Sequence, residues 1–275
     1  MPEPILTAHL FPKVERLLIE LLRLLGPADW QAQTVSPKWR VKDVAAHLLD
    51  TQLRKLALLR DDFATERPNI DSPADLTAYI NRLNDEGVAY FRRLSPALLV
   101  SLMELASRQS CAFHEALDPW AAAAFPVSWA GERQSLNWFD TAREYTERWH
   151  HQQQIRLAIN RPGIETPELY HPVLDCFMRA LPHSYRNVSA AAGTSLRFDV
   201  AGPAGGTWFL ERGETGWTLS SEASVAPAAS ARIPQEIAWR IFTKGIDPIA
   251  ARAQIRFSGD AALAERILGT LAIVG

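Results

Sequence analysis

Hydrophobic residues in the first 160 positions of the chain recur every three to four residues, the period of an amphipathic α-helix. Capping residues, prolines and glycines set the expected helix limits. The predicted helices span residues 10–25, 41–62, 72–94, 97–110 and 135–160. No strand-like alternation interrupts them, so the pattern predicts a helical bundle, a fold that often builds metal and cofactor sites from facing helices.

The pattern changes after residue 162. Short β-rich runs, separated by Gly and Pro, predict strands over 195–200, 207–212, 217–220 and 254–257. Helical segments are expected over 167–181, 234–244 and 260–268, and the Ser/Ala-rich stretch 220–231 is expected to be a surface loop. We therefore predict two domains, a bundle over 1–162 and an α+β domain over 163–275 with helices against an antiparallel sheet.

Two irregular segments stand between the predicted helices of the bundle. The segment 27–40 contains Trp30 and Trp39 just before a helix, where aromatic residues either staple the loop to the bundle or wall the mouth of a pocket. The segment 118–135 contains two prolines, a glycine and two tryptophans. A loop of this length in a compact domain often covers a site.

Composition and charge narrow the class of protein. The chain has 275 residues, of which 47% are hydrophobic and 22% charged, as in soluble globular proteins with an ample core. Its net charge of −2 and its lack of like-charge runs argue against binding to nucleic acid. We expect a small-molecule substrate, and leave open whether the protein is a monomer or a homodimer.

The amino-terminal segment does not resemble a signal peptide or a membrane span. Charged residues such as Lys13, Glu15 and Glu20 interrupt its apolar positions. The two cysteines, Cys111 and Cys176, form no CxxC motif, which suits a reducing compartment. We therefore expect a cytoplasmic protein with no membrane partner, and assign neither cysteine a nucleophilic role.

Glu147 and His151 are the strongest candidates for chemistry. They stand four residues apart in a predicted helix, and residues at this spacing lie on the same helix face. A third ligand is available in His47, which lies beside the apolar stripe of the helix predicted over 41–62. Together they would form a half-open site for a divalent metal ion.

Each of these residues also has a simpler interpretation. Glu147 can pair with Arg143 one turn earlier, in an exposed contact worth a few tenths of a kcal/mol. His47 can be a hydrogen-bonded core histidine, and His151 a surface one. His150 is not a predicted ligand, because it points about 100° away from His151 around the helix.

Three tracts of the sequence resemble a known family. They are WRVKDVAAHLLD, EYTERWHHQQQIRLAINRPG and FSGDAALAERILGTLAIVG, and together they look like the mycothiol-dependent maleylpyruvate isomerase family. The resemblance extends over nearly the whole chain. It implies an α plus α+β fold, in which a DinB-like four-helix bundle precedes a small sterol-carrier-protein-like α+β domain.

The resemblance also implies a divalent metal, usually zinc, held by residues that match His47, Glu147 and His151, together with activation of a low-molecular-weight thiol such as mycothiol. Relatives often carry an acidic residue where this chain has Gln154, a departure that would change the group behind His151. The ligand types alone leave iron, nickel and manganese open, so zinc depends on the resemblance.

Three functions remain open at this stage. The first is a thiol-dependent transferase or isomerase, in which three protein ligands leave a coordination position for a sulfur that the ion keeps deprotonated. The second is a hydrolase that uses metal-bound water, and the third is a non-catalytic protein that binds a small molecule or lipid. Cationic residues of the second domain that are candidates to contact substrate are Arg240, Lys244 and Arg256.

Overall fold

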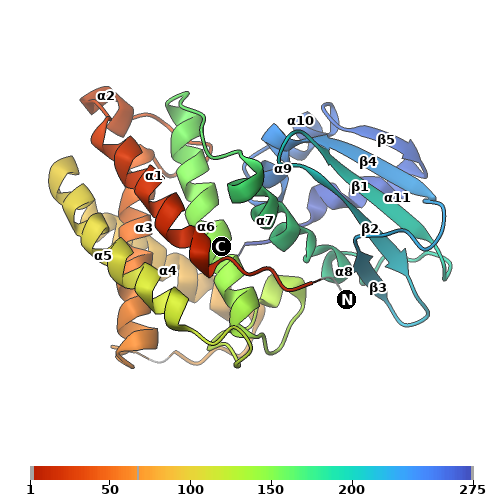
Figure 1. The fold of residues 1–275 in the computed structure, drawn as a ribbon, viewed down its shortest axis with the longest axis horizontal. Coiled ribbons are helices and arrows are strands. Elements are labelled where there is room, and N and C mark those ends of the chain that lie inside the picture. Colours follow the sequence, from red (N-terminus) through yellow and green to blue (C-terminus); the bar gives the residue numbers. More distant parts are fainter. Residues whose placement is uncertain (1–2, 67, 274–275) are drawn as a thin grey trace. The chain divides into compact units, whose positions relative to one another are not determined.

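The structure, a computed structural model, describes residues 3–66 and 68–273 and contains two compact units (Figure 1). The helical unit comprises residues 7–124 and 144–164, and the sheet unit comprises residues 3–6, 125–143 and 165–273. Both units are discontinuous in sequence, so their bounds differ from those of the predicted domains. Whether residues 1–162 and 163–275 fold independently stays a prediction. Their outer ends, residues 1 and 275, lie outside the described residues.

The helical unit is built from long helices, as the sequence predicts. They are α1 (Phe11–Arg23), α3 (Val41–Lys55), α4 (Pro73–Phe91), α5 (Pro96–Ala116) and most of α6 (Asn137–Ala158). A short π-helix, Leu56–Arg60, continues α3, and a 3-10 turn, Ala8–Leu10, precedes α1. Helix α5 extends six residues beyond the predicted end at Ser110, and the short helix α2 (Pro27–Trp30) lies inside a segment expected to be a loop.

Serine caps and prolines explain where two of these helices begin. The Ser72 side chain accepts a hydrogen bond from the Asp75 backbone N–H, and Ser95 accepts one from Leu98. Each cap is followed directly by a proline, whose missing N–H would have no partner in the first turn. The capping pattern predicted at Ser72 is confirmed.

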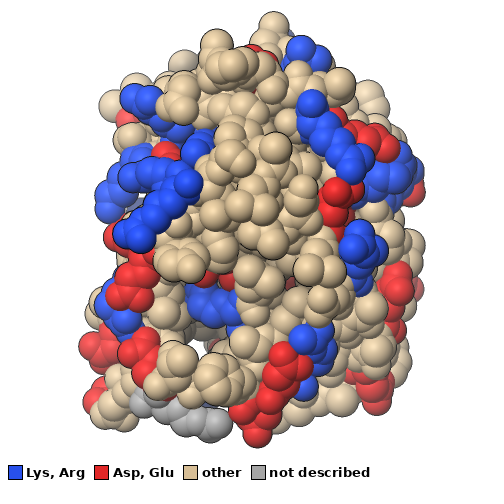
Figure 2. Space-filling model, turned by 90° about the vertical axis from the view of Figure 1, so that its left-hand side faces the viewer, with Lys and Arg blue, Asp and Glu red and all other residues tan. Residues whose placement is uncertain are grey.

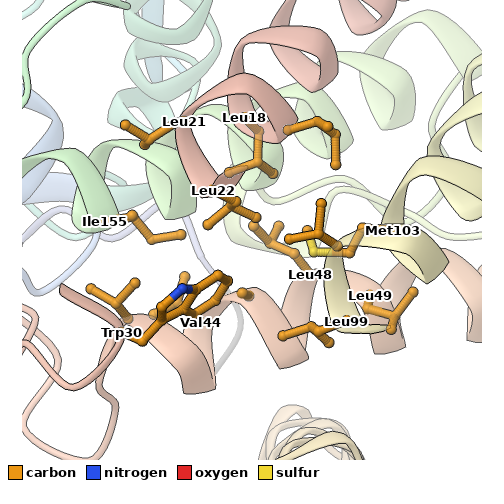
Figure 3. Packing of buried hydrophobic residues seen from close by; sticks show 14 of the residues in the cluster. Leu18, Leu21, Leu22, Trp30, Val44, Leu48, Leu49, Leu99, Met103 and Ile155 are labelled. Atoms are coloured by element: carbon orange, nitrogen blue, oxygen red, sulfur yellow. The ribbon is translucent and has the colours of Figure 1, made fainter. Parts of the chain in front are cut away.

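The core of the helical unit forms where α1, α2, α3, α5 and α6 meet (Figure 3). Leu18 and Leu22 of α1, Leu48 of α3 and Met103 of α5 are all buried in it. Side chains of this size stabilise a fold by roughly 1.5–3 kcal/mol each when fully buried. The packing therefore fixes the helices that carry the candidate ligands.

The sheet unit contains a five-stranded mixed sheet in the order β3-β2-β1-β4-β5. Its strands are β1 (Ser195–Ala201), β2 (Gly206–Arg212), β3 (Trp217–Ser220), β4 (Ala229–Pro234) and β5 (Arg256–Gly259). Its helices are α7 (Pro167–Met178), α8 (Leu181–Ser184), α9 (Gln235–Phe242), α10 (Pro248–Arg252) and α11 (Ala261–Glu265). Helices α8, α9 and α11 pack against the sheet (Figure 1).

Two sequence predictions about this unit are wrong. The sheet is not wholly antiparallel, because β1 and β4 pair in parallel. Strand β4 also begins within the stretch expected to be a surface loop, and Ala229, Ala231 and Ile233 alternate into the core. Alanine has a low intrinsic preference for strands, so the local signal was weak until the neighbouring strand supplied a partner.

The surface drawn in Figure 2 mixes charges of both signs along its borders, and its centre is largely uncharged. This distribution agrees with the net charge of −2. Across residues 3–66 and 68–273, none of the helices has the length and apolar character needed to cross a membrane. The segment 118–135 is mostly irregular, with one 3-10 turn at Ser128–Ala130, and whether it covers a site stays a prediction.

Candidate metal centre

Helices α3 and α6 bring His47, Glu147 and His151 together in the helical unit. One potential ligand atom from each lies within 4.8 Å of the others. Glu147 Oε2 and His151 Nε2 are 3.4 Å apart, and the ring centres of His47 and His151 are separated by 4.6 Å. The three residues that the sequence singled out therefore converge on one small volume.

The spacing suits a metal ion. Zinc lies about 2.0–2.2 Å from nitrogen and oxygen ligands, so two tetrahedral ligand atoms stand about 3.4 Å apart. The Glu147–His151 distance already has this value, and the whole set spans no more than 4.8 Å. The spacing of the three groups is therefore compatible with one shared ion.

His151 is oriented by a hydrogen bond within α6. Its Nδ1 lies 2.9 Å from Gln154 Oε1, and an amide oxygen only accepts, so this bond assigns the ring proton to Nδ1. The lone pair then stays on Nε2, which faces Glu147. Gln154 thus lies directly behind His151, and its neutral amide is the hydrogen-bond partner of this candidate ligand.

His47 is buried and carries no charge near neutral pH. Burial, reinforced by the nearby His151, holds the pKa of His47 well below its ordinary value. Its Nδ1 is buried and has no hydrogen-bond partner among the described residues. A neutral imidazole with an unpaired nitrogen is the form that binds metals, so the donor set fits a divalent cation.

His150 and Trp39 complete the surroundings, in ways the sequence did not establish. His150 is not one of the three converging residues, but it is buried and its ring centre lies 4.0 Å from that of His151. Burial lowers the pKa of His150 to about 4. Trp39 lies 4.7 Å from the His47 ring and 5.9 Å from the His151 ring, so the tryptophan walls the site.

The simpler interpretations of the three residues can now be compared with the structure. His151 is buried instead of lying on the surface. Glu147 is the most accessible of the three, with 28% of its side chain exposed. The three groups thus offer a candidate set of ligands that is open on the side of Glu147.

The family models give the decisive comparison. Residues 11–156, just over half of the chain, match the family model described as the mycothiol maleylpyruvate isomerase N-terminal domain. The chain belongs to this family. The maleylpyruvate isomerase resemblance noted in the sequence is therefore confirmed, and the matched range includes all three residues of the cluster.

Two solved structures resemble this family member. One, a histidine-to-alanine mutant of the mycothiol-dependent maleylpyruvate isomerase, has a TM-score of 0.51 and 14% identity, with 94% of this chain and 96% of that chain covered. The other, the mycothiol-dependent maleylpyruvate isomerase itself, has a TM-score of 0.48 and 14% identity, with 87% and 91% covered. The first supports the fold, a helical region followed by a small sheet unit. No curated protein is significantly similar to the chain.

The cationic candidates belong to the sheet unit of this maleylpyruvate isomerase family member. Arg240 Nε donates to the Gly245 carbonyl, and Lys244 has a left-handed backbone with φ of 58°. Arg256 is exposed on β5. Their role toward a substrate stays a prediction.

The two cysteines are buried and unbridged. Burial, with Glu15 nearby, raises the pKa of Cys111 to about 12. Cys111 is therefore a thiol at neutral pH, and thiols are poor nucleophiles.

Proposed function

We propose that the protein is a metal-dependent enzyme in which His47, Glu147 and His151 hold one divalent ion, zinc in the first instance. The observation that carries the proposal is the convergence of their ligand atoms within 4.8 Å. Three protein ligands are typical of catalytic zinc sites, which keep one position for water or substrate. Structural zinc sites commonly use four protein ligands.

We further propose that the reaction is a transfer or isomerisation of a small molecule that uses a low-molecular-weight thiol. Support comes from the family, and from a similar structure described as a mycothiol-dependent maleylpyruvate isomerase. When bound, the ion would favour the deprotonated form of a coordinated thiol. The two cysteines are buried and form no disulfide, so we propose that the nucleophile comes from the thiol ligand. They also suit the reducing cytoplasm that we propose as the protein's location.

The protein's own side chains have separate tasks in this scheme. Gln154 orients His151 through Nδ1 and so keeps Nε2 directed toward Glu147. Trp39 shields the two imidazole rings from water on one side. His47 stays neutral near pH 7 because burial disfavours its charged form.

Metal analysis of protein purified without a nickel column tests the centre. We expect close to one equivalent in the wild type and most of it lost in His47→Ala, Glu147→Ala and His151→Ala, because two ligands hold a divalent ion poorly. His171→Ala, in α7, is the control that should keep the metal, and His150→Ala should keep it too, because His150 is not one of the three converging residues. Equal metal content in the wild type and all three ligand variants would refute the centre.

Cobalt-substituted protein separates the possible reactions. Adding 2-mercaptoethanol should shift the cobalt absorption bands if sulfur enters the open position, while ethylene glycol serves as the matched oxygen control. A shift with neither compound, together with ester or amide hydrolysis, would favour a hydrolase. Retention of an apolar ligand by metal-free protein would favour a binding protein.

A further inference from the structure

A buried polar cluster lies beside the candidate centre and includes one side chain from each of four helices: Glu15 of α1, Gln52 of α3, Ser107 of α5 and Arg148 of α6. Gln52 donates to Glu15 Oε1 and Ser107 donates to Glu15 Oε2, both at 2.8 Å. Arg148 Nε is 3.5 Å from Glu15 Oε1, an ion-pair contact. The carboxylate is therefore compensated from three helices.

Arg148 also reaches α3. Its Nη1 donates to the Leu48 carbonyl and to Thr51 Oγ1, both at 3.2 Å. The planar guanidinium presents donors in fixed directions, so one side chain can contact α1 and α3 at once. Arg148 directly follows Glu147, and Leu48 directly follows His47.

These contacts are part of a series along the two helices. His47 lies against His151, Thr51 against Arg148, and Lys55 forms an ion pair with Glu144. The residue numbers rise along α3 as they fall along α6, so the helices are antiparallel, and contacts recur about once per turn. Arg148 provides the middle contact of this series.

The register of the two helices decides whether the candidate ligands meet. A slide of one residue moves a helix by about 1.5 Å and a slide of one turn by about 5.4 Å. The three ligand atoms lie within 4.8 Å of one another, so a one-turn slide would separate them. Functional groups commonly need positioning to within about 0.5 Å.

Stability alone gives a poor account of Arg148. A buried ion pair is often no more stabilising than apolar residues of similar volume. Arg148 is only 2% exposed, and its Nη2 is buried without a hydrogen-bond partner in the described chain. An unpaired buried donor destabilises the folded protein. The presence of Arg148 would therefore be explained by a role in positioning a neighbouring part of the molecule.

We propose that Arg148 is a positioning residue, which holds α6 in register with α3 so that His47 meets Glu147 and His151. The inference rests on the proposed metal centre and goes beyond it, because Arg148 is not a ligand. Its contacts to Leu48 and Thr51 are made next to two of the ligands, whereas its contact to Glu15 anchors it to α1.

The test compares cobalt binding with folding. Arg148→Met alone leaves Glu15 without its counter-charge, so the main variant is the double change Glu15→Gln with Arg148→Met, which removes both charges. We expect this protein to fold but to bind cobalt about 10-fold more weakly than wild type, with altered absorption bands. Arg148→Lys keeps the charge but cannot span both helices, and we expect it to bind more weakly than wild type too.

Arg156→Met is the matched control. Arg156 is also a buried arginine of α6, but it donates to the carbonyls of Leu17, Arg161 and Pro162 and makes none of these contacts with α3. Its loss should lower the unfolding midpoint of metal-free protein and leave cobalt affinity and spectrum unchanged. Thr51→Val, which removes one acceptor of Arg148, should weaken cobalt binding less than the double change does.

The outcomes separate the two proposals. Wild-type cobalt affinity and spectrum in the folded double variant would overturn the positioning role while leaving the metal centre intact. Failure of the wild type itself to take up cobalt would overturn both. If the double variant does not fold, Arg148→Lys and Thr51→Val decide the question. Cobalt affinity equal to that of the wild type in both would also overturn the inference.

Discussion

Helix α6 and the sheet bury very different side chains. From Glu144 to Arg156, α6 is buried at every position except the half-buried Glu147, although most of these residues are polar or charged. In the sheet, buried and exposed positions alternate, and the inner face carries apolar residues such as Phe198 and Ile233. One element places polar groups inside the protein, and the other keeps them at the surface.

The two regions also differ in how buried polar groups are satisfied. In the sheet unit, the Tyr170 hydroxyl donates to the Gln235 carbonyl and accepts from the Trp239 backbone N–H. In α6, the amide atoms of Gln152 and Nη2 of Arg148 are buried without hydrogen-bond partners among the described residues. Buried side-chain atoms without a hydrogen-bond partner in the described chain also occur in the sheet, at Ser195 and Arg212, but more of them belong to α6. The unpaired buried groups therefore make α6 less favourable for stability than the sheet.

The largest effect should come from the apolar face of the sheet. Phe198 is fully buried and packs near Tyr185, so Phe198→Ala should lower the free energy of unfolding by about 3–5 kcal/mol. Metal content should not change in the protein that remains folded, which denaturant unfolding and metal analysis would measure together. If Phe198→Ala lost metal while its free energy of unfolding stayed equal to that of the wild type, the comparison between the two regions would be wrong.

A smaller loss is expected from the polar cluster. Gln52→Leu keeps the side-chain volume but removes a donor to Glu15, which leaves a buried carboxylate less well paired. The free energy of unfolding should fall by about 1–3 kcal/mol. Glu20→Gln is the control. Glu20 lies in α1, like Glu15, but it pairs with Arg16 on the exposed side of that helix, and exposed ion pairs contribute little to stability. If both variants lost the same free energy of unfolding, the buried cluster would contribute no more to stability than an exposed ion pair.

Gln154 should affect metal affinity more than folding. Gln154→Leu removes the acceptor of the His151 ring proton, and we expect metal binding to weaken about 10-fold, measured by competition with a chromophoric chelator. Gln154→Glu should strengthen binding, because a carboxylate acceptor makes the ligand nitrogen more basic. Unchanged affinity in both variants would mean that the hydrogen bond does not support a ligand.

The smallest effect concerns Cys111. Its pKa is raised from 9.0 to about 12, so the folded protein keeps the thiol proton over a range in which the unfolded chain loses it. This thiol should therefore not affect the free energy of unfolding below pH 9. As the pH rises above 9 the free energy of unfolding should fall, and it should fall less steeply in Cys111→Ala than in the wild type. At pH 8 the native protein should react slowly with a disulfide reagent, and both cysteines should react after denaturation. Rapid reaction of one native thiol would contradict this.

Local sequence signals were sufficient for the helices and for the choice of candidate ligands. The period of hydrophobic residues located the long helices, and Ser72 marked the start of α4 through its cap. The spacing of Glu147 and His151 needs only the geometry of one helix, so it could be read without knowledge of the fold. The sequence also indicated His47, because an imidazole beside an apolar stripe is expected to face inward.

Contacts between distant segments decided the rest. The parallel pairing of β4 with β1 depends on a strand more than twenty-five residues away, and alanines give little local sign of it. Burial of His150, the position of Trp39 over the two imidazoles, and the reach of Arg148 to α3 follow from how α3 and α6 pack. Periodicity specifies which face of a helix is apolar, but the register between two helices is set by side chains that meet only in the folded chain.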